Sequence, residues 1–206
     1  MAIENLTTYY SDAYPGYLFT ITSTRVTIED LVGDRIESVH KDFGASHFDA
    51  IDLLFTFRIS SLTEYGGRGG LGFSNNSSGG YSTWTGDRIV IEFYRNSDGK
   101  YYVYLSEYGY PYDNCQVSVD TPYYCRLVRT AGSENATLYI YTDSSRATLH
   151  DTLTMSGLGT TKFRYLFVAC GNGSGDPDAE FEGYLENFEF VLPSRGGGAQ
   201  IIGLGL

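Results

Sequence analysis

The sequence of 206 residues is poor in cysteine and in basic residues, and each shortage excludes a class of protein. Three cysteines without a C-x-x-C spacing give neither a zinc motif nor a disulfide framework. Cys125 and Cys170 lie in apolar runs, so small buried thiols are the simpler interpretation, although a bond from Cys125 to Cys115 or to Cys170 stays open. Only 14 lysines and arginines are scattered along a chain of net charge −11. We therefore expect no nucleic-acid partner, because phosphate neutralisation needs clustered positive charge.

Long apolar runs are also missing. No stretch approaches the roughly 18 apolar residues of a membrane-spanning helix, so we expect no membrane insertion. The start, MAIENLTTYY, has neither the basic nor the apolar region of a secretory signal peptide. We expect a protein that is made in the cytoplasm or reaches the outside of a cell by lysis or a dedicated route.

What the chain does contain is typical of an all-β protein. It has 25 glycines and 19 tyrosines, while charged residues make up 19%. Strand-like segments of alternating character occupy residues 51–60, 88–95, 100–108, 162–170 and 182–192. The pieces YGGRGG, SNNSSGG, RNSDGK and CGNGSGDPD are rich in turn formers and separate strands. Many short strands joined by glycine-rich turns predict a β-sandwich or barrel.

The stretch YYCRLVRTAGSENATLYIYTD, residues 123–143, predicts a hairpin. One face of its strands is apolar and points to a core, and the other carries tyrosines whose rings are buried while their hydroxyls stay wet. The inner set is Cys125, Leu127, Leu138 and Ile140. A second segment, residues 26–43, has nearly helical apolar spacing, but Gly33-Asp34 at its centre favours two strands and a turn.

The two ends of the chain differ from its middle. Residues 1–19, with the cluster TTYYSDAYPGY, are expected to form an arm that precedes a sandwich over residues 20–192. After Pro193 three glycines lead into an apolar tail, residues 193–206. Its side chains Ile201, Ile202, Leu204 and Leu206 have no partner nearby in the sequence, so we expect them to anchor the chain in an oligomer.

Several segments, in this order, resemble the concanavalin A-like (laminin G-like) jelly-roll domains of tailed phages and environmental viruses: FDAIDLLFTFRIS, GLGFSNN, RIVIEFYRNSDGKYYVYL, TPYYCRLVRT, TLYIYTDSSRATLHDTL, KFRYLFVAC and EGYLENFEF. The resemblance covers residues 20–192. It implies an all-β, two-sheet antiparallel jelly-roll sandwich with a concave face. Members of the family bind glycans, hydrolyse them or build virus particles, and the fold alone does not choose among these roles.

Glycan contact is the sharpest chemical expectation. Aromatic rings stack on the C–H faces of sugars, while amides and carboxylates bond to sugar hydroxyls. The stretch SEYGYPYDN and the loop-like GGYSTWTGD supply such residues: Tyr108, Tyr110, Tyr112, Asp113, Asn114, Tyr81 and the single tryptophan, Trp84. The same residue types suit contact with a protein partner, and that alternative stays open.

Catalytic and metal motifs are weak. A glycoside hydrolase needs two carboxylates across the bond, and the nearest pair is Glu180 and Glu182, which also fits an exposed acidic strand. No Gly-x-Ser-x-Gly elbow is present, and none of the histidines lies in a nucleophile motif. We expect no cofactor. For calcium, which laminin G-like domains often hold, the loop GNGSGDPDAE offers Asp176 and Asp178, and Asp143 could sit at another rim, but an ordinary polar turn is the simpler interpretation.

These observations favour a non-enzymatic structural or decoration subunit of a phage-like particle that assembles through its termini. The expected partners are further copies of the chain or other particle subunits. The expected location is the virion surface, or the extracellular space after lysis. One alternative is a glycan-binding adhesion module that holds a polysaccharide, and a second is a weak glycoside hydrolase.

Overall fold

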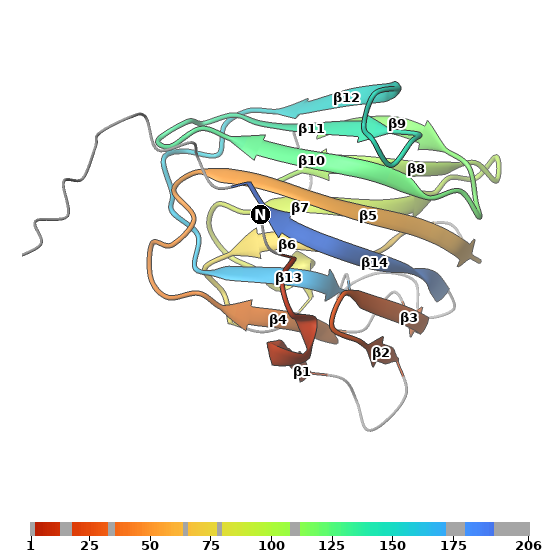
Figure 1. The fold of residues 1–206 in the computed structure, drawn as a ribbon, viewed down its shortest axis with the longest axis horizontal. Helices are drawn as coiled ribbons and strands as arrows, with labels where there is room; N and C mark the ends of the chain where they lie inside the picture. Colours follow the sequence, from red (N-terminus) through yellow and green to blue (C-terminus); the bar gives the residue numbers. More distant parts are fainter. Residues whose placement is uncertain are drawn as a thin grey trace, which may run out of the picture.

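The computed structural model describes residues 3–12, 18–32, 36–63, 66–77, 80–107, 112–171 and 180–191. Its described strands form two antiparallel sheets of seven strands each. Sheet A has the order β12-β11-β10-β5-β14-β3-β2, and sheet B the order β1-β4-β13-β6-β7-β8-β9. In Figure 1 the strands of both sheets run across the picture. The predicted all-β two-sheet sandwich is confirmed.

The strands of sheet A are β2 (Phe19–Ile21), β3 (Arg25–Val32), β5 (Ile51–Leu62), β10 (Tyr123–Arg129), β11 (Ala136–Tyr141), β12 (Leu149–Met155) and β14 (Glu180–Phe190). Those of sheet B are β1 (Tyr10–Asp12), β4 (Ser38–Asp42), β6 (Gly66–Ser74), β7 (Ile89–Arg95), β8 (Tyr101–Ser106), β9 (Tyr112–Val117) and β13 (Tyr165–Cys170). Two short 3-10 helices, η1 (Leu6–Thr8) and η2 (Tyr81–Thr83), lie outside the sheets. None of the helical segments in the described part of the chain has the length and hydrophobicity of a membrane span.

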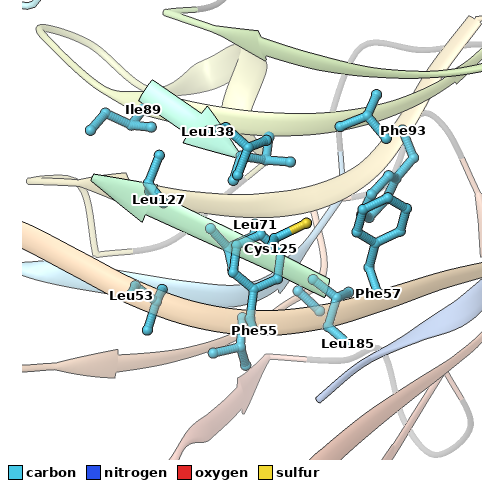
Figure 2. Close-up of a cluster of buried hydrophobic side chains, with 14 of the residues drawn as sticks. Leu53, Phe55, Phe57, Leu71, Ile89, Phe93, Cys125, Leu127, Leu138 and Leu185 are labelled. Carbon is cyan, nitrogen blue, oxygen red and sulfur yellow. The ribbon is translucent and has the colours of Figure 1, made fainter. Parts of the chain in front are cut away.

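Alternation along each strand builds the core between the sheets. Leu53, Phe55 and Phe57 of β5 point inward and are fully buried. They meet Leu71 of β6 and Phe93 of β7 from the opposite sheet (Figure 2). The ring centroids of Phe57 and Phe93 are 4.9 Å apart, so the two sheets make direct aromatic contact. Because the side-chain period of a strand is two, the residues that alternate with these inward side chains face outward.

The predicted hairpin is β10 paired with β11. Cys125, Leu127, Leu138 and Ile140 are all fully buried, as expected. At the end of β10, Arg129 is also buried, and its guanidinium donates to the carbonyl oxygens of Ser133, Thr161 and Gly159. These bonds tie the hairpin loop to the segment that follows β12, and they offset part of the cost of burying the charge.

Residues 26–43 form strands, as predicted, but the two strands do not make one hairpin. β3 pairs with β14 and β2 in sheet A, whereas β4 pairs with β13 and β1 in sheet B. The chain therefore crosses from one sheet to the other between them. The apolar spacing that imitated a helix arises from two separate alternating strands placed end to end.

The N-terminal residues pack on the sandwich. Leu6 is fully buried, Tyr9 is 7% exposed, and β1 extends sheet B by pairing with β4. Ile3 forms an isolated bridge with Glu189 of β14. Residues 3–12, which the sequence placed in an arm, thus contribute both to the core and to a sheet edge. The predicted tail, residues 193–206, lies outside the described residues.

The piece YGGRGG, residues 65–70, is predicted to be a turn from its glycines, and this prediction is wrong. Gly66 to Gly72 belong to a strand that pairs with β7 and β13. A Cβ atom at Gly72 would lie 2.8 Å from the ring of Trp84, and one at Gly70 would lie 2.1 Å from the carbonyl oxygen of Ile91. Glycine is needed here because another group approaches the strand closely, which the sequence pattern does not distinguish from a turn.

We expect Leu6→Ala to lower the free energy of unfolding by roughly 2–5 kcal/mol, because it opens a cavity in the core. The matched control is Ile3→Ala, three residues earlier, whose side chain is 49% exposed. It is expected to change stability by less than about 1 kcal/mol. Urea unfolding followed by circular dichroism measures both, and equal effects of the two substitutions would contradict the packing of the N-terminal segment described here.

We expect Gly72→Ala to displace Trp84 and to lower the free energy of unfolding by about 1–3 kcal/mol through overpacking. Trp84 is the only tryptophan, so its fluorescence emission should shift to longer wavelength as the ring meets water. Gly44→Ala is the control for the emission: alanine is strained at the φ of +93° found there and also lowers stability, but nothing lies within 4 Å of its Cβ atom, so Trp84 should not move. An unshifted emission in the Gly72→Ala variant would contradict the close contact between the Trp84 ring and strand β6.

Candidate functional site

The outward side of sheet B brings several polar and aromatic side chains into rows that cross the strands. One row joins Glu92 of β7, Tyr104 of β8 and Asn114 of β9, which are direct cross-strand partners. The next row joins Tyr94 of β7 to Tyr102 of β8. All five side chains are half-buried. We call this group, Glu92, Tyr94, Tyr102, Tyr104 and Asn114, the tyrosine face.

The ring of Tyr104 contacts the other two rings of the tyrosine face. The centroids of Tyr94 and Tyr104 are 5.3 Å apart with their planes at 71°, an edge-to-face arrangement. Those of Tyr102 and Tyr104 are 6.3 Å apart. Edge-to-face contacts of this kind stabilise an aromatic cluster beyond the burial of its area. The cluster therefore holds rigid ring surface beside a carboxylate and an amide, which together can contact both the apolar and the polar parts of a ligand.

A second part of the same outward side is covered by the protein itself. Trp84, 3% exposed, lies on Gly72 and packs against Phe167, with ring centroids 4.5 Å apart. Val90, Tyr165 and Cys170 complete this small apolar cluster. The guanidinium of Arg88 donates to the carbonyl oxygen of Trp84 and, over 2.9 Å, to that of Glu107, which fixes the loop over the strands.

His40 extends the covered part towards β1. Its ring lies 4.9 Å from that of Phe167 and 5.3 Å from that of Tyr10, and its Nδ1 is 3.1 Å from Oγ of Ser38. His40 and Ser38 are both buried. A seryl nucleophile must be reachable by its substrate, so this buried pair serves packing in the present geometry rather than catalysis.

The sequence-predicted contact residues fall into different environments. Trp84 does not present its ring to solvent, because the loop that carries it folds back on sheet B. Tyr108 and Tyr110 lie outside the described residues, and the structure places the backbone but not the side chains of Tyr81 and Tyr112. Of the predicted set, Asn114 is the residue that joins the tyrosine face.

Asp113 has a structural connection across the sandwich. Its carboxylate accepts hydrogen bonds from the backbone N–H of Asn114, over 2.9 Å, and from that of Thr154 in β12, over 3.0 Å. Nearby, Nε2 of His150 lies 2.9 Å from the carbonyl oxygen of Gln116. These contacts join the edge strand β9 of sheet B to the edge strand β12 of sheet A and close the sandwich on that side.

Four members of the tyrosine face are not among the contact residues predicted from the sequence: Glu92, Tyr94, Tyr102 and Tyr104. The signal was present in the alternation of RIVIEFYR and KYYVYLSEY, because Ile91, Phe93, Val103 and Leu105 are fully buried and the residues between them must face outward. What the sequence does not give is the register that sets Glu92 beside Tyr104 and Tyr94 beside Tyr102.

A calcium ion finds no ready site in the described part of the chain. No group of three histidine, cysteine or acidic side chains comes together among the described residues. The carboxylate of Asp143 instead accepts hydrogen bonds from the side chain of Ser145 and from the backbone N–H groups of Thr148 and Ala147. These bonds hold its own turn and keep the pKa of the carboxyl well below its usual range. Asp176 and Asp178 lie outside the described residues, so calcium there stays a prediction.

The carboxylates Glu180 and Glu182 lie at the start of β14, both exposed, in sheet A. They are thus in the sheet opposite the tyrosine face. The three thiols, Cys115, Cys125 and Cys170, are separate, buried and unpaired. Burial raises the pKa of each, that of Cys115 to about 12, so none is a reactive thiolate at neutral pH.

Comparison with known proteins shows the fold. No protein-family model and no curated protein matches the sequence. Among solved structures, a legume lectin-like domain from Entamoeba histolytica is 13% identical with a TM-score of 0.58, over 91% of this chain and 92% of that one. The exoplasmic/lumenal domain of VIP36, bound to Ca²⁺ and Man2, is 13% identical with a TM-score of 0.51, over 93% and 89%.

A sialidase is also similar, at 13% identity and a TM-score of 0.57 over 92% of this chain, but the match covers only 17% of the sialidase chain. At such identities the likeness establishes a shared architecture and no activity. The protein therefore shares the fold of these structures, a two-sheet antiparallel jelly-roll sandwich of concanavalin A-like architecture, which the resemblance predicted. A viral type is not part of what these similarities show.

Proposed function

We propose that the protein is a glycan-binding module and that the tyrosine face is its binding surface. The observation that carries the proposal is the cluster of Tyr94, Tyr102 and Tyr104 beside Glu92 and Asn114 on the outward side of one sheet. The lectin-like architecture supports it, since the similar structures include a lectin-like domain and a domain bound to Man2.

The chemistry of the face fits a sugar. A pyranose ring has an apolar C–H face that stacks on an aromatic ring and a rim of hydroxyls that both donate and accept hydrogen bonds. The tyrosine rings supply contact area at small cost in side-chain entropy. The carboxylate of Glu92 accepts from hydroxyls, and the amide of Asn114 both donates and accepts.

Binding without cleavage is part of the proposal. Glycoside hydrolysis requires two carboxylates about 5–10 Å apart across the scissile bond, and the tyrosine face has one, Glu92. The similarity to a sialidase covers a small part of that enzyme and does not argue for its activity here. The pair Glu180 and Glu182 remains a prediction from the sequence, with no further observation in its favour.

The role of a structural subunit on a phage-like particle, at a virion surface or outside the cell after lysis, also remains a prediction. It rests on the family resemblance and on the tail residues 193–206, which the structure does not describe. A particle subunit could carry a glycan-binding face, so the two roles are compatible.

We expect the purified protein to bind a subset of polysaccharides on a glycan array, and Tyr104→Ala to weaken that binding about tenfold, equivalent to about 1.4 kcal/mol. Tyr139→Ala is the matched control, because Tyr139 is also half-buried and also lies on a strand next to an edge strand, but faces outward from sheet A, beside Arg126. Retained thermal stability of both variants excludes unfolding as the cause. Binding that is equally weakened by both substitutions, or no binding to any glycan on the array, would reject the proposal.

A further inference from the structure

The outward side of sheet A contains a groove that the tyrosine face does not use. It has a volume of about 350 Å³ and lies over β3, β5 and β14. Arg25, Arg58, Glu182 and Tyr184 line it, together with the hydroxyl-bearing Thr27 and Ser60. Its volume falls at the lower end of the range for small-molecule sites, which is suitable for a ligand of one or two sugar rings.

Gly183 forms part of the lining and marks an irregularity in the sheet beneath the groove. The register between β14 and both of its neighbours shifts at this residue, so that Gly183 pairs with Ile28 on one side and Ile59 on the other. A Cβ atom on Gly183 would lie 2.3 Å from the carbonyl oxygen of Arg58. The irregularity therefore requires glycine, because the carbonyl group of Arg58 and the ring of Phe181 occupy the space that a side chain would need.

One wall of the groove is held in place by a stacked ion pair. The guanidinium carbon of Arg25 lies 4.2 Å from the centroid of the Tyr184 ring, and the same guanidinium contacts the carboxylate of Glu186 at 2.6 Å. Stacking and pairing together restrict both the arginine and the tyrosine. The wall is thus organised before a ligand arrives, which reduces the entropy cost of binding.

The opposite wall contains an arginine with hydrogen-bonding capacity to spare. Arg58 pairs with Asp120 through one terminal nitrogen. Its Nε is buried and has no acceptor among the described residues. A buried donor without an acceptor costs roughly 1–3 kcal/mol. A ligand oxygen seated beside Arg58 would supply that acceptor after a small rotation of the guanidinium.

The charges around the groove select the class of ligand. Arg25 and Arg58 are each paired with a carboxylate, whereas Glu29 and Glu182 are exposed and add two negative charges. An anion would meet these carboxylates, and a cation would meet the two guanidinium groups. A neutral ligand rich in hydroxyls avoids both penalties, because each hydroxyl donates to a carboxylate or accepts from an arginine.

We propose that this groove is a binding site for a neutral polyhydroxylated ligand, a hexose unit, held between Arg58 and Glu182 over Gly183. The site is on the sheet opposite the tyrosine face and shares no residue with it. The inference therefore does not rest on the function proposed above.

The test follows the Nε–Hε resonance of Arg58 by nuclear magnetic resonance, identified by its loss in Arg58→Lys. D-glucose, D-galactose and D-mannose are the neutral probes, and glucuronate and glucosamine are the anionic and cationic counterparts of glucose. We expect a saturable shift with at least one neutral hexose and weaker binding of both charged sugars. Glu182→Ala should weaken the neutral interaction about tenfold, as the loss of a charge-assisted hydrogen bond does.

Glu189→Ala is the matched control, because it removes the same charge from the same strand outside the groove and should leave binding unchanged. The absence of a saturable shift with all three hexoses overturns the proposal. Tighter binding of glucuronate or glucosamine than of glucose overturns the assignment to a neutral ligand, and equal loss in the Glu182 and Glu189 variants overturns the role of Glu182. Tyr104→Ala should leave the Arg58 signal unaffected, so failure of the tyrosine face and failure of the groove are distinguished.

Discussion

The strand register of sheet B is the constraint on which the presented surface depends. Each central strand alternates between side chains that fill the core and side chains that face outward, and a slip of one residue would exchange the two sets. With Val103 and Leu105 in the core, Tyr102 and Tyr104 must face outward. The pairing with β7 and β9 then determines which neighbours these tyrosines have, Glu92 and Asn114 among them.

Much of the architecture could be predicted from the sequence because alternation and turn chemistry are local properties. The strands at 51–60, 88–95 and 123–129 follow directly from these properties. The edge strands β1, β2 and β9 could not, because they are short, and their pairing is decided by partners far away in the chain. The glycines of YGGRGG were mispredicted for a related reason: Gly70 is required by the close approach of the β7 backbone at Ile91, which no local pattern reveals.

For the candidate sites too, the sequence gives the types of residue available, but not which of them lie together on the surface. Tyrosine content predicted an aromatic contact surface, but the loop bearing Trp84 folds onto Gly72 and removes that ring from the surface. Asn114 was identified from its neighbours in the sequence, whereas Glu92 and the groove around Gly183 depend on strands brought together by folding. Residue types thus indicated the kind of chemistry, whereas the order of the strands in each sheet determines which of these residues lie together.

The N-terminal segment supplies one edge strand to each sheet: β1 borders sheet B and β2 borders sheet A. The other two edges, β9 and β12, are tied to each other by hydrogen bonds between Asp113 and Thr154 and between His150 and Gln116. On the N-terminal side, the backbone groups of β3 and β4 are therefore covered by the first residues of the chain. Proteolytic removal of these residues would leave two open templates for strand addition on one molecule, and chains so trimmed would be prone to exchange segments or grow into linear aggregates.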